Sequence, residues 1–196
     1  MDNLKQGLIQ VYTGDSKGKS TAAFGLVSRA IGHNLKCYII QFMKGSSYYG
    51  ELTTWSRLYP LIEYSQYGRV CSHSNLIRQG ESDCLGCGNC FVRKGAATPE
   101  DRKGGLLALK KAKEVFMRGE HDVVVLDELN NALFFELITW EEVEEILNLK
   151  PEKVEVIITG RNAPPELIER ADLVTEMKMI KHPFEKGIAS RRGIEY

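Results

Sequence analysis

The chain has 196 residues, of which 43% are hydrophobic and 27% are charged, as expected for one ordinary domain over residues 1–196 with a substantial core. Its 26 Lys and Arg residues balance 26 Asp and Glu residues, so net charge favours neither a nucleic-acid nor a membrane partner. Residues 1–8 lack the features of a signal peptide, and no apolar run approaches the ~20 residues of a membrane span. We therefore expect a cytoplasmic protein.

Short β-branched runs alternate with segments of helical spacing along the chain. The runs predict strands at residues 8–13, 37–42, 61–66, 122–127, 154–159 and 173–177. Helical spacing and capping residues predict helices at residues 23–31, 99–118, 140–150 and 165–171. Gly32, Gly119 and Pro151 are expected to end the first three helices, and residues 68–97 read as a long polar loop. This alternation predicts an α/β fold with a mostly parallel sheet flanked by helices.

A loop rich in glycine and lysine joins the first predicted strand to the first predicted helix. Its residues are Gly14, Asp15, Ser16, Lys17, Gly18, Lys19, Ser20 and Thr21. In a phosphate loop, backbone N–H groups and a helix N-terminus surround the phosphates, while a lysine adds charge and a hydroxyl binds magnesium. The usual pattern has one more residue before the Gly-Lys pair, so Thr13 stands where the first glycine normally lies. The strand and helix on either side favour a nucleotide-binding loop over an ordinary glycine-rich turn.

Two further strand ends supply charged residues. Asp127 and Glu128 follow a buried strand, and ligands of open α/β sheets gather at the carboxyl edge of the strands. We predict that one carboxylate holds magnesium together with Ser20, with Glu128 favoured as the ligand and Asp127 as its support. The alternative is that Asp127 only caps the next segment. Arg161 leaves another buried strand at the same edge, where it either reaches a phosphate or remains a solvated loop arginine.

With these motifs in order, the chain resembles the corrinoid adenosyltransferases, which convert reduced cobalamin or precursors such as cob(I)yrinic acid a,c-diamide to the adenosyl form. The resemblance runs from Ile9 to Tyr196 and rests on the segments VYTGDSKGKSTAAFGL, IIQFMKG, VVLDELN, IITGRNAP, KHPFEKGI and RRGIEY. It implies a RecA-like phosphate-loop fold, a homodimer, a role in cobalamin biosynthesis, and the substrates ATP and a corrinoid. The shortened phosphate loop is also similar to that of this family.

The resemblance also implies the chemistry. Cobalt(I) attacks the 5′ carbon of ATP and releases triphosphate, so the phosphate loop would stabilise a leaving group. Lys19, Glu128 and Arg161 are the implied catalytic residues, with Lys17 and magnesium on Ser20 beside them. An electron donor must supply the cobalt(I) state, and the protein must remove the lower axial ligand of cobalt(II).

Aromatic side chains on one loop accompany the lower corrinoid face in the family. The equivalent stretch here holds Phe91 as its nearby aromatic residue, while Trp55 and Trp140 lie elsewhere. Phe91 is therefore the predicted corrinoid contact. Lys181-His182-Pro183-Phe184 either closes over a substrate or is a packed tail.

Four of the five cysteines fall in the predicted loop. Cys84, Cys87 and Cys90 have C-x2-C-x2-C spacing, Cys71 supplies a fourth thiol, and His73 is a substitute ligand. The spacing is similar to part of a ferredoxin site without its final Cys-Pro, and a four-thiolate zinc site is the other choice. An iron–sulfur cluster would suggest a path for an electron to cobalt, whereas zinc would only fold the loop. The remaining interpretation is a set of free surface thiols.

Two other functions fit the same loop. A phosphotransferase or NTPase would use the same nucleotide site, although the sequence offers no obvious acceptor site. A corrinoid-binding carrier or sensor would use ATP only to stabilise its fold. The products formed from ATP, and turnover of free corrinoid, distinguish them.

Overall fold

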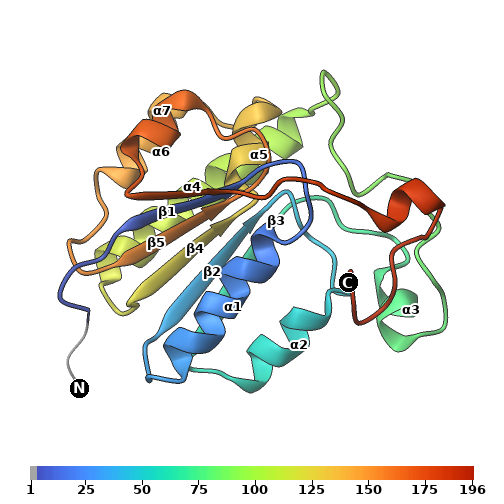
Figure 1. Ribbon diagram of the computed structural model, residues 1–196, viewed down its shortest axis with the longest axis horizontal. Helices are drawn as coiled ribbons and strands as arrows, with labels where there is room; N and C mark the ends of the chain where they lie inside the picture. The colour runs from blue at the N-terminus through green and yellow to red at the C-terminus, as the bar shows by residue number, and fades with distance from the viewer. Residues whose placement is uncertain (1–3) are drawn as a thin grey trace.

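The computed structural model describes residues 4–196, so the N-terminal segment 1–8 lies partly outside the described chain. At its centre six parallel strands form one sheet, in the order β3-β2-β4-β5-β1-β6 (Figure 1). The strands are β1 (Ile9–Thr13), β2 (Cys37–Phe42), β3 (Ile62–Tyr67), β4 (Val123–Asp127), β5 (Glu155–Thr159) and β6 (Leu173–Glu176). The predicted α/β class and parallel sheet are confirmed. Within residues 4–196, no helix is both long and apolar enough to cross a membrane.

Helices cover both faces of the sheet (Figure 1). One face carries α1 (Lys19–Ile31) and α2 (Gly50–Arg57), and the other carries α4 (Pro99–Arg118), α5 (Leu129–Phe134), α6 (Trp140–Leu147) and α7 (Pro165–Arg170). In β4, Val125 packs with the first layer, whereas Val124 and Leu126 pack with the second. Side chains alternate along a strand, so a strand covered on both faces is apolar at every position. This is why β4 reads as a continuous apolar run.

The prediction of an unbroken loop over residues 68–97 was wrong, because this segment contains α3 (Ser74–Gln79). The helices α2 and α5 were also not predicted. These three helices have only six to eight residues each, which is too short for an apolar repeat to be distinguished from a loop.

Of the three predicted helix ends, one was wrong and two are confirmed. The helix α6 ends at Leu147, before Pro151, and residues 148–149 form a turn. Gly119 ends α4 in the left-handed conformation, with φ 63°, as its position after the helix predicts. Gly32 ends α1 with φ −61°, so this stop does not use the special conformational freedom of glycine.

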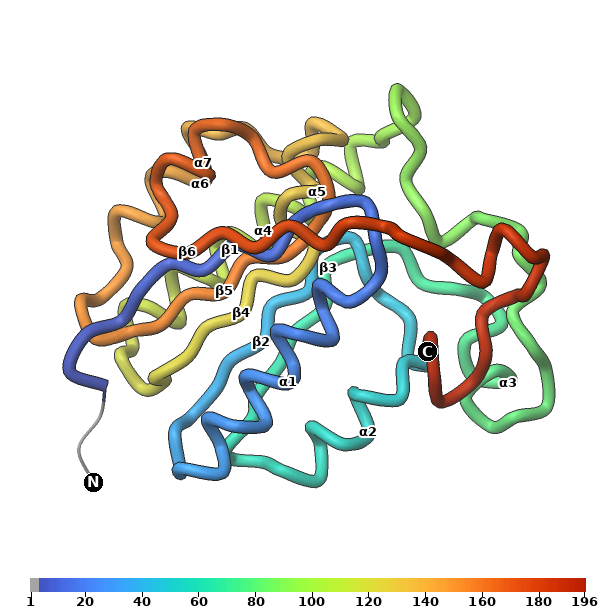
Figure 2. The backbone as a smooth tube through the Cα atoms, in the orientation of Figure 1, coloured from blue at the N-terminus to red at the C-terminus, as the bar shows by residue number. Residues whose placement is uncertain are grey.

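The strand order brings three loops together at the carboxyl edge of the sheet. The strand β5 lies between β4 and β1, so the segments that begin at Gly14, Glu128 and Gly160 are neighbours. The chain crosses from β1 to β2 and later returns through β4, which creates the crevice where open α/β sheets bind ligands. After β6, the chain passes through a 3-10 turn, η1 (Pro183–Lys186), and runs back across this edge toward α2 and α3 (Figure 2).

Candidate active site

The phosphate loop is a tight turn between β1 and α1. Gly14 and Gly18 have φ values of 100° and 120°, which side chains other than glycine rarely adopt. A Cβ atom on Gly14 would lie 2.5 Å from the carbonyl oxygen of Met177, so glycine also makes room for the neighbouring chain. Met177 supports the loop from outside, because its N–H donates to Thr13 O at 2.8 Å and its carbonyl accepts from Ser16 N at 3.0 Å.

Lys19 folds back over this loop. Its Nζ donates to the carbonyl oxygens of Gly14 and Ser16, at 2.9 and 2.6 Å, and the residue is buried. Burial lowers the pKa of Lys19, and the neighbouring charge of Glu128 partly opposes that change. The ammonium is therefore held by loop carbonyls beside the cavity that a nucleotide phosphate would enter.

Asp127 is the buried centre of the site and lies at the end of β4. Its Oδ1 accepts from Thr159 Oγ1 at 2.7 Å, and its Oδ2 accepts from Gln41 Nε2 at 2.9 Å and from Lys44 Nζ at 2.8 Å. Burial by itself would raise the pKa of Asp127, but the charge of Lys44 and hydrogen bonds from Lys44, Ser20 and Thr159 outweigh it and lower the pKa. Asp127 is thus an ionised carboxylate whose oxygens are already engaged.

Glu128 is the acid that faces the cavities. It is the residue before α5 and has φ 65°, and its carboxylate accepts a hydrogen bond from the side chain of Asn131. Burial raises the pKa of Glu128, the charge of Asp127 raises it further, and Lys44 and Lys19 oppose the rise. The structure therefore separates the two neighbouring acids into one that is enclosed by donors and one that borders open space.

Asn131 was missed by sequence reasoning. Its Nδ2 donates to Glu128, while its Oδ1 accepts from the backbone N–H of Arg161 at 3.0 Å. One amide therefore connects the loops that follow β4 and β5. The sequence signal was its position on the first turn after the Asp-Glu pair, which was not distinctive without the neighbouring loop.

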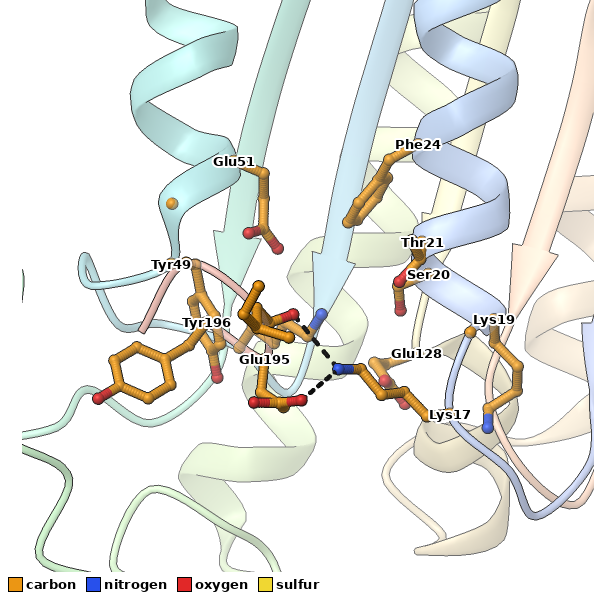
Figure 3. Close-up of a pocket in the computed structure, with 15 residues that line it drawn as sticks. Lys17, Lys19, Ser20, Thr21, Phe24, Tyr49, Glu51, Glu128, Glu195 and Tyr196 are labelled. Carbon is orange, nitrogen blue, oxygen red and sulfur yellow. Dashed lines mark hydrogen bonds and ion pairs between the residues drawn. The ribbon is translucent and has the colours of Figure 1, made fainter. Parts of the chain in front are cut away.

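Two cavities meet at the phosphate loop. The smaller, of about 440 Å³, lies between the start of α1 and the C-terminal residues (Figure 3). Its lining includes Lys17, Gly18, Lys19, Ser20, Thr21, Phe24, Tyr49, Glu51, Glu128, Glu195 and Tyr196. The larger, of about 620 Å³, includes Ser16, Arg69, Cys90, Phe91, Phe134, Phe135, Arg161 and His182 in its lining. Both are bordered by Lys17, Lys19, Lys44, Tyr49, Glu128 and Glu195.

The predicted nucleotide residues occupy different parts of this arrangement. Lys17, Lys19, Ser20 and Thr21 border the smaller cavity, and Arg161 borders the larger one. Asp15 is exposed and its side chain lines neither cavity. His182 lines the larger cavity and accepts a hydrogen bond from Phe184 N at 3.1 Å, so this part of the tail does reach the candidate site.

Phe91 lines the larger cavity, as expected for a corrinoid contact, and 62% of its surface is exposed. Phe134, the last residue of α5, and Phe135, which follows it, line the same cavity with their ring centroids 5.3 Å apart in an edge-to-face arrangement. Sequence reasoning missed this aromatic pair because α5 itself was not predicted. Lys94 Nζ lies 4.7 Å from the Phe134 ring centroid, so the cysteine-containing segment also contacts α5.

Arg69 holds the Phe91 segment against α4. Its guanidinium forms two hydrogen bonds to Asp101, of 2.8 and 2.5 Å, and donates to the carbonyl of Phe91 at 3.2 Å. Asp101 also closes the capping box of α4 by accepting from Thr98 N at 2.8 Å. The hydrogen bond from Arg69 lowers the pKa of Asp101 to about 2.

The four loop cysteines are free thiols near one another. Cys84 and Cys87 are exposed, whereas Cys71 and Cys90 are partly buried. Burial raises the pKa of the Cys90 thiol, and Cys71, then Cys84 and Cys87, raise it further. Among residues 4–196, no three His, Cys, Asp or Glu side chains are positioned as a metal-ligand set. His73 is the residue preceding α3.

The Arg69–Asp101 contact predicts a specific acid response. Because the folded-state pKa of Asp101 is about 2 and its ordinary value is 3.8, its stabilising contribution is present above pH 3.8 and is lost as pH falls toward 2. We expect the Asp101→Asn variant to lose less unfolding free energy than the unmodified protein between pH 4 and pH 2. Urea unfolding at each pH measures this difference, and parallel stability curves would contradict the assignment.

Comparisons with known proteins identify the family of this chain. A family model described as ATP:corrinoid adenosyltransferase BtuR/CobO/CobP matches residues 5–196. A corrinoid adenosyltransferase from Sinorhizobium is 40% identical over 193 residues, which is 98% of this chain and 81% of that protein. Corrinoid adenosyltransferases from Pseudomonas aeruginosa and Escherichia coli K12 are 33% and 32% identical, each over 98% of this chain and over 85% and 87% of their own lengths.

The fold is also similar to a solved structure. The flagellar accessory protein FlaH from Methanocaldococcus jannaschii superimposes with a TM-score of 0.55 at 14% identity, covering 88% of this chain and 72% of FlaH. At this identity the similarity concerns the fold alone, and it confirms the RecA-like phosphate-loop architecture. The family model, the full-length relatives and the phosphate loop at the sheet edge together show that this chain belongs to the ATP:corrinoid adenosyltransferase family.

Proposed function

We propose that the chain transfers the adenosyl group of ATP to a reduced corrinoid. Cobalt(I) supplies the electron pair for a new bond to the 5′ carbon of ATP, the bond from that carbon to the phosphate oxygen breaks, and triphosphate leaves with the electrons of that bond. The observation that supports this most directly is the meeting of two cavities, one bordered by the phosphate loop and one by aromatic residues, at shared lysines.

The cations at this junction suit a triphosphate leaving group. Lys17 and Lys19 come from the phosphate loop and Arg161 from the loop after β5, so positive charge surrounds the place where negative charge would develop. Lys19 and Arg161 act here by electrostatic stabilisation. No general base is required, because cobalt(I) attacks carbon without losing a proton.

The oxygen donors beside the loop fit a magnesium ion. The hydroxyl of Ser20 and the carboxylate of Glu128 both border the smaller cavity, and magnesium prefers oxygen ligands of this kind. Asp127 binds Lys44, Gln41 and Thr159 and hydrogen-bonds Ser20, which supports an orienting role rather than direct ligation. When bound, magnesium would supply further positive charge to the triphosphate.

The corrinoid would occupy the larger cavity. Phe91, Phe134 and Phe135 provide apolar surface there, and Arg161 and the phosphate-loop lysines line the same cavity. Excluding water from the lower face of the macrocycle is the role we assign to these rings, since a cobalt ion without a lower ligand is more easily reduced. An external electron donor, a homodimeric assembly and a cytoplasmic location remain predictions from the sequence and its resemblance.

A phosphotransferase or NTPase would cleave between phosphates, whereas adenosyl transfer leaves all three phosphates joined. We therefore expect an anaerobic reaction of ATP with chemically reduced cobalamin to yield adenosylcobalamin and triphosphate in equal amounts. Formation of ADP and phosphate without a cobalt–carbon bond would support the NTPase instead. Binding of corrinoid without turnover would support a carrier.

Replacement of Lys19 tests the role of the phosphate loop. We expect Lys19→Met to lower kcat for adenosylcobalamin formation by about 10²- to 10³-fold, the usual cost of removing one group that stabilises developing charge. Lys110→Met is the matched control, because Lys110 is an exposed lysine of α4 outside both cavities. Equal activities of the two variants would argue against a catalytic role for Lys19.

Replacement of Phe134 tests the corrinoid cavity. We expect Phe134→Ala to raise KM for cobalamin by about tenfold, as loss of ~1.5 kcal/mol of aromatic contact would, with little change in KM for ATP. Phe184→Ala is the control, since Phe184 is 78% exposed on η1 and does not line this cavity. A rise in KM for ATP alone would reverse the assignment of the two cavities.

We also propose that Cys71, Cys84, Cys87 and Cys90 form a four-thiolate site when a thiophilic metal binds. Support comes from their spacing, their mutual effect on the pKa of Cys90, and Gly86 and Gly88, whose φ values of 64° and 74° turn the chain sharply between the thiols. The backbone N–H of Cys71 already donates to Ser46 Oγ at 3.0 Å, which anchors one ligand beside the larger cavity.

Metal analysis of anaerobically purified protein tests this site. We expect about one zinc ion per chain, or iron with acid-labile sulfide and visible absorption, and loss of the metal in the Cys84→Ser/Cys87→Ser variant. Cys37→Ala is the control, because Cys37 is buried at the start of β2, away from the loop. Protein without zinc or iron, or metal retained by the double variant, would overturn the proposal.

A further inference from the structure

The last residues of the chain form one wall of the smaller cavity. Gly193, Ile194, Glu195 and Tyr196 line it opposite the phosphate loop, although more than 170 residues separate them in sequence from Lys17. In Figure 3, Glu195 and Lys17 point toward one another, and both line this cavity. These C-terminal residues therefore lie on the route that a triphosphate would take to the loop.

Contacts with three other segments hold the C-terminal tail, residues 191–196, in this place. Lys17 Nζ donates to Glu195 Oε1 at 2.8 Å and to the carbonyl of Ile194 at 3.3 Å. The ring of Tyr196 lies edge-to-face against Tyr48, with centroids 5.5 Å apart. A third contact, from Arg192 to the carbonyl at the end of α3, is 2.8 Å long. The tail thus spans from the phosphate loop to α3.

Glu195 lies between two cations. Besides Lys17, Arg191 binds it through its backbone N–H at 2.7 Å and its guanidinium at 3.1 and 3.2 Å. Hydrogen bonds from Arg191 and then Lys17 hold the pKa of Glu195 well below its usual range. A guanidinium and an ammonium are also the groups that bind phosphate oxygens, so the Glu195 carboxylate lies where a phosphate oxygen would be bound.

The two phosphate-loop lysines are therefore satisfied in different ways. Lys19 donates to carbonyls of its own loop, whereas Lys17 is neutralised by a carboxylate from a remote segment. The side chains of Lys17 and Glu195 retain 43% and 21% of their exposed surface, so this ion pair is partly solvated and is readily exchanged for another anion. A triphosphate carries several negative charges and would compete with one carboxylate for the same ammonium.

We propose that Glu195 is a positioning residue that occupies Lys17 in place of a phosphate, so that residues 191–196 act as a latch which triphosphate binding displaces. This inference rests on the proposed binding of triphosphate at the loop. Displacement transfers Lys17 from Glu195 to the phosphates and leaves Arg191 as the remaining cationic partner of Glu195. Nucleotide binding at the loop and attachment of the tail therefore oppose each other. The attached tail lowers the affinity for triphosphate, and bound triphosphate weakens the attachment of the tail by the same factor.

Calorimetric titration with inorganic triphosphate and magnesium, and separately with ATP and magnesium, tests the latch. Because Glu195→Gln removes the competing charge, we expect it to bind triphosphate about two- to fivefold more tightly than the unmodified protein. Glu185→Gln is the matched control, since Glu185 is an exposed acid of η1 outside both cavities, and it should bind normally.

A double-mutant cycle separates competition for Lys17 from a general loosening of the tail. In the Lys17→Met background, Glu195→Gln should no longer change the affinity for triphosphate, because the shared ammonium is gone. Hydrogen exchange supplies a second measurement: triphosphate should increase exchange in residues 191–196 of the unmodified protein, and Glu195→Gln should show that increase without ligand.

Unchanged or weaker triphosphate binding by Glu195→Gln would overturn the latch while leaving the proposed function intact. Protection of residues 191–196 on triphosphate binding would overturn it as well, because the tail would then be a closing wall. Persistence of the Glu195→Gln effect in the Lys17→Met background would show that the tail acts independently of Lys17. Failure of every variant, and of the unmodified protein, to bind triphosphate would instead overturn the proposed function together with the latch.

Discussion

The site is organised around one buried ion pair between Asp127 and Lys44. Asp127 stands at the end of β4, Lys44 follows β2, and Thr159 at the end of β5 donates to the same carboxylate. An unpaired carboxylate at this depth would be costly, so these three chain segments must meet for any of them to be stable there. Because Ser20 also bonds to Asp127, the start of α1 is aligned with the same group.

This arrangement gives two adjacent acids different surroundings. The donors around Asp127 consume its hydrogen-bonding capacity, while Glu128 turns away in a left-handed conformation and borders the open cavities. Asn131 then links Glu128 to the loop that carries Arg161. One side-chain amide therefore holds Glu128, which would bind the metal, and the backbone of Arg161, whose side chain would stabilise the leaving triphosphate.

At the same edge of the sheet, the phosphate loop lies beside a cavity lined by Phe91, Phe134 and Phe135. In a reaction at the 5′ carbon, the triphosphate is the leaving group. The loop would bind it and stabilise its growing negative charge, while the nucleophile approaches the carbon from another side. The larger cavity offers that approach, between the phenylalanines of α5 and the segment that Arg69 ties to α4. The cysteines are on this segment, so a metal bound by them would constrain the wall near Phe91 rather than the phosphate loop.

Local patterns in the sequence were sufficient for the parallel sheet, the phosphate loop and the Asp127-Glu128 pair, because apolar periodicity, glycine positions and strand-end charges are properties of short segments. Position along the chain favoured Glu128 as the metal ligand and Asp127 as its support, but the physical cause of that difference depends on Lys44 and Thr159, which lie 83 and 32 residues from Asp127. The sequence did not predict the roles of Phe134 and Phe135 because α5 is too short to be recognised. It did not predict the contact of Glu195 with Lys17 because the two residues are 178 positions apart. Tertiary structure decided these points because burial and charge pairing arise only when remote segments share one edge of the sheet.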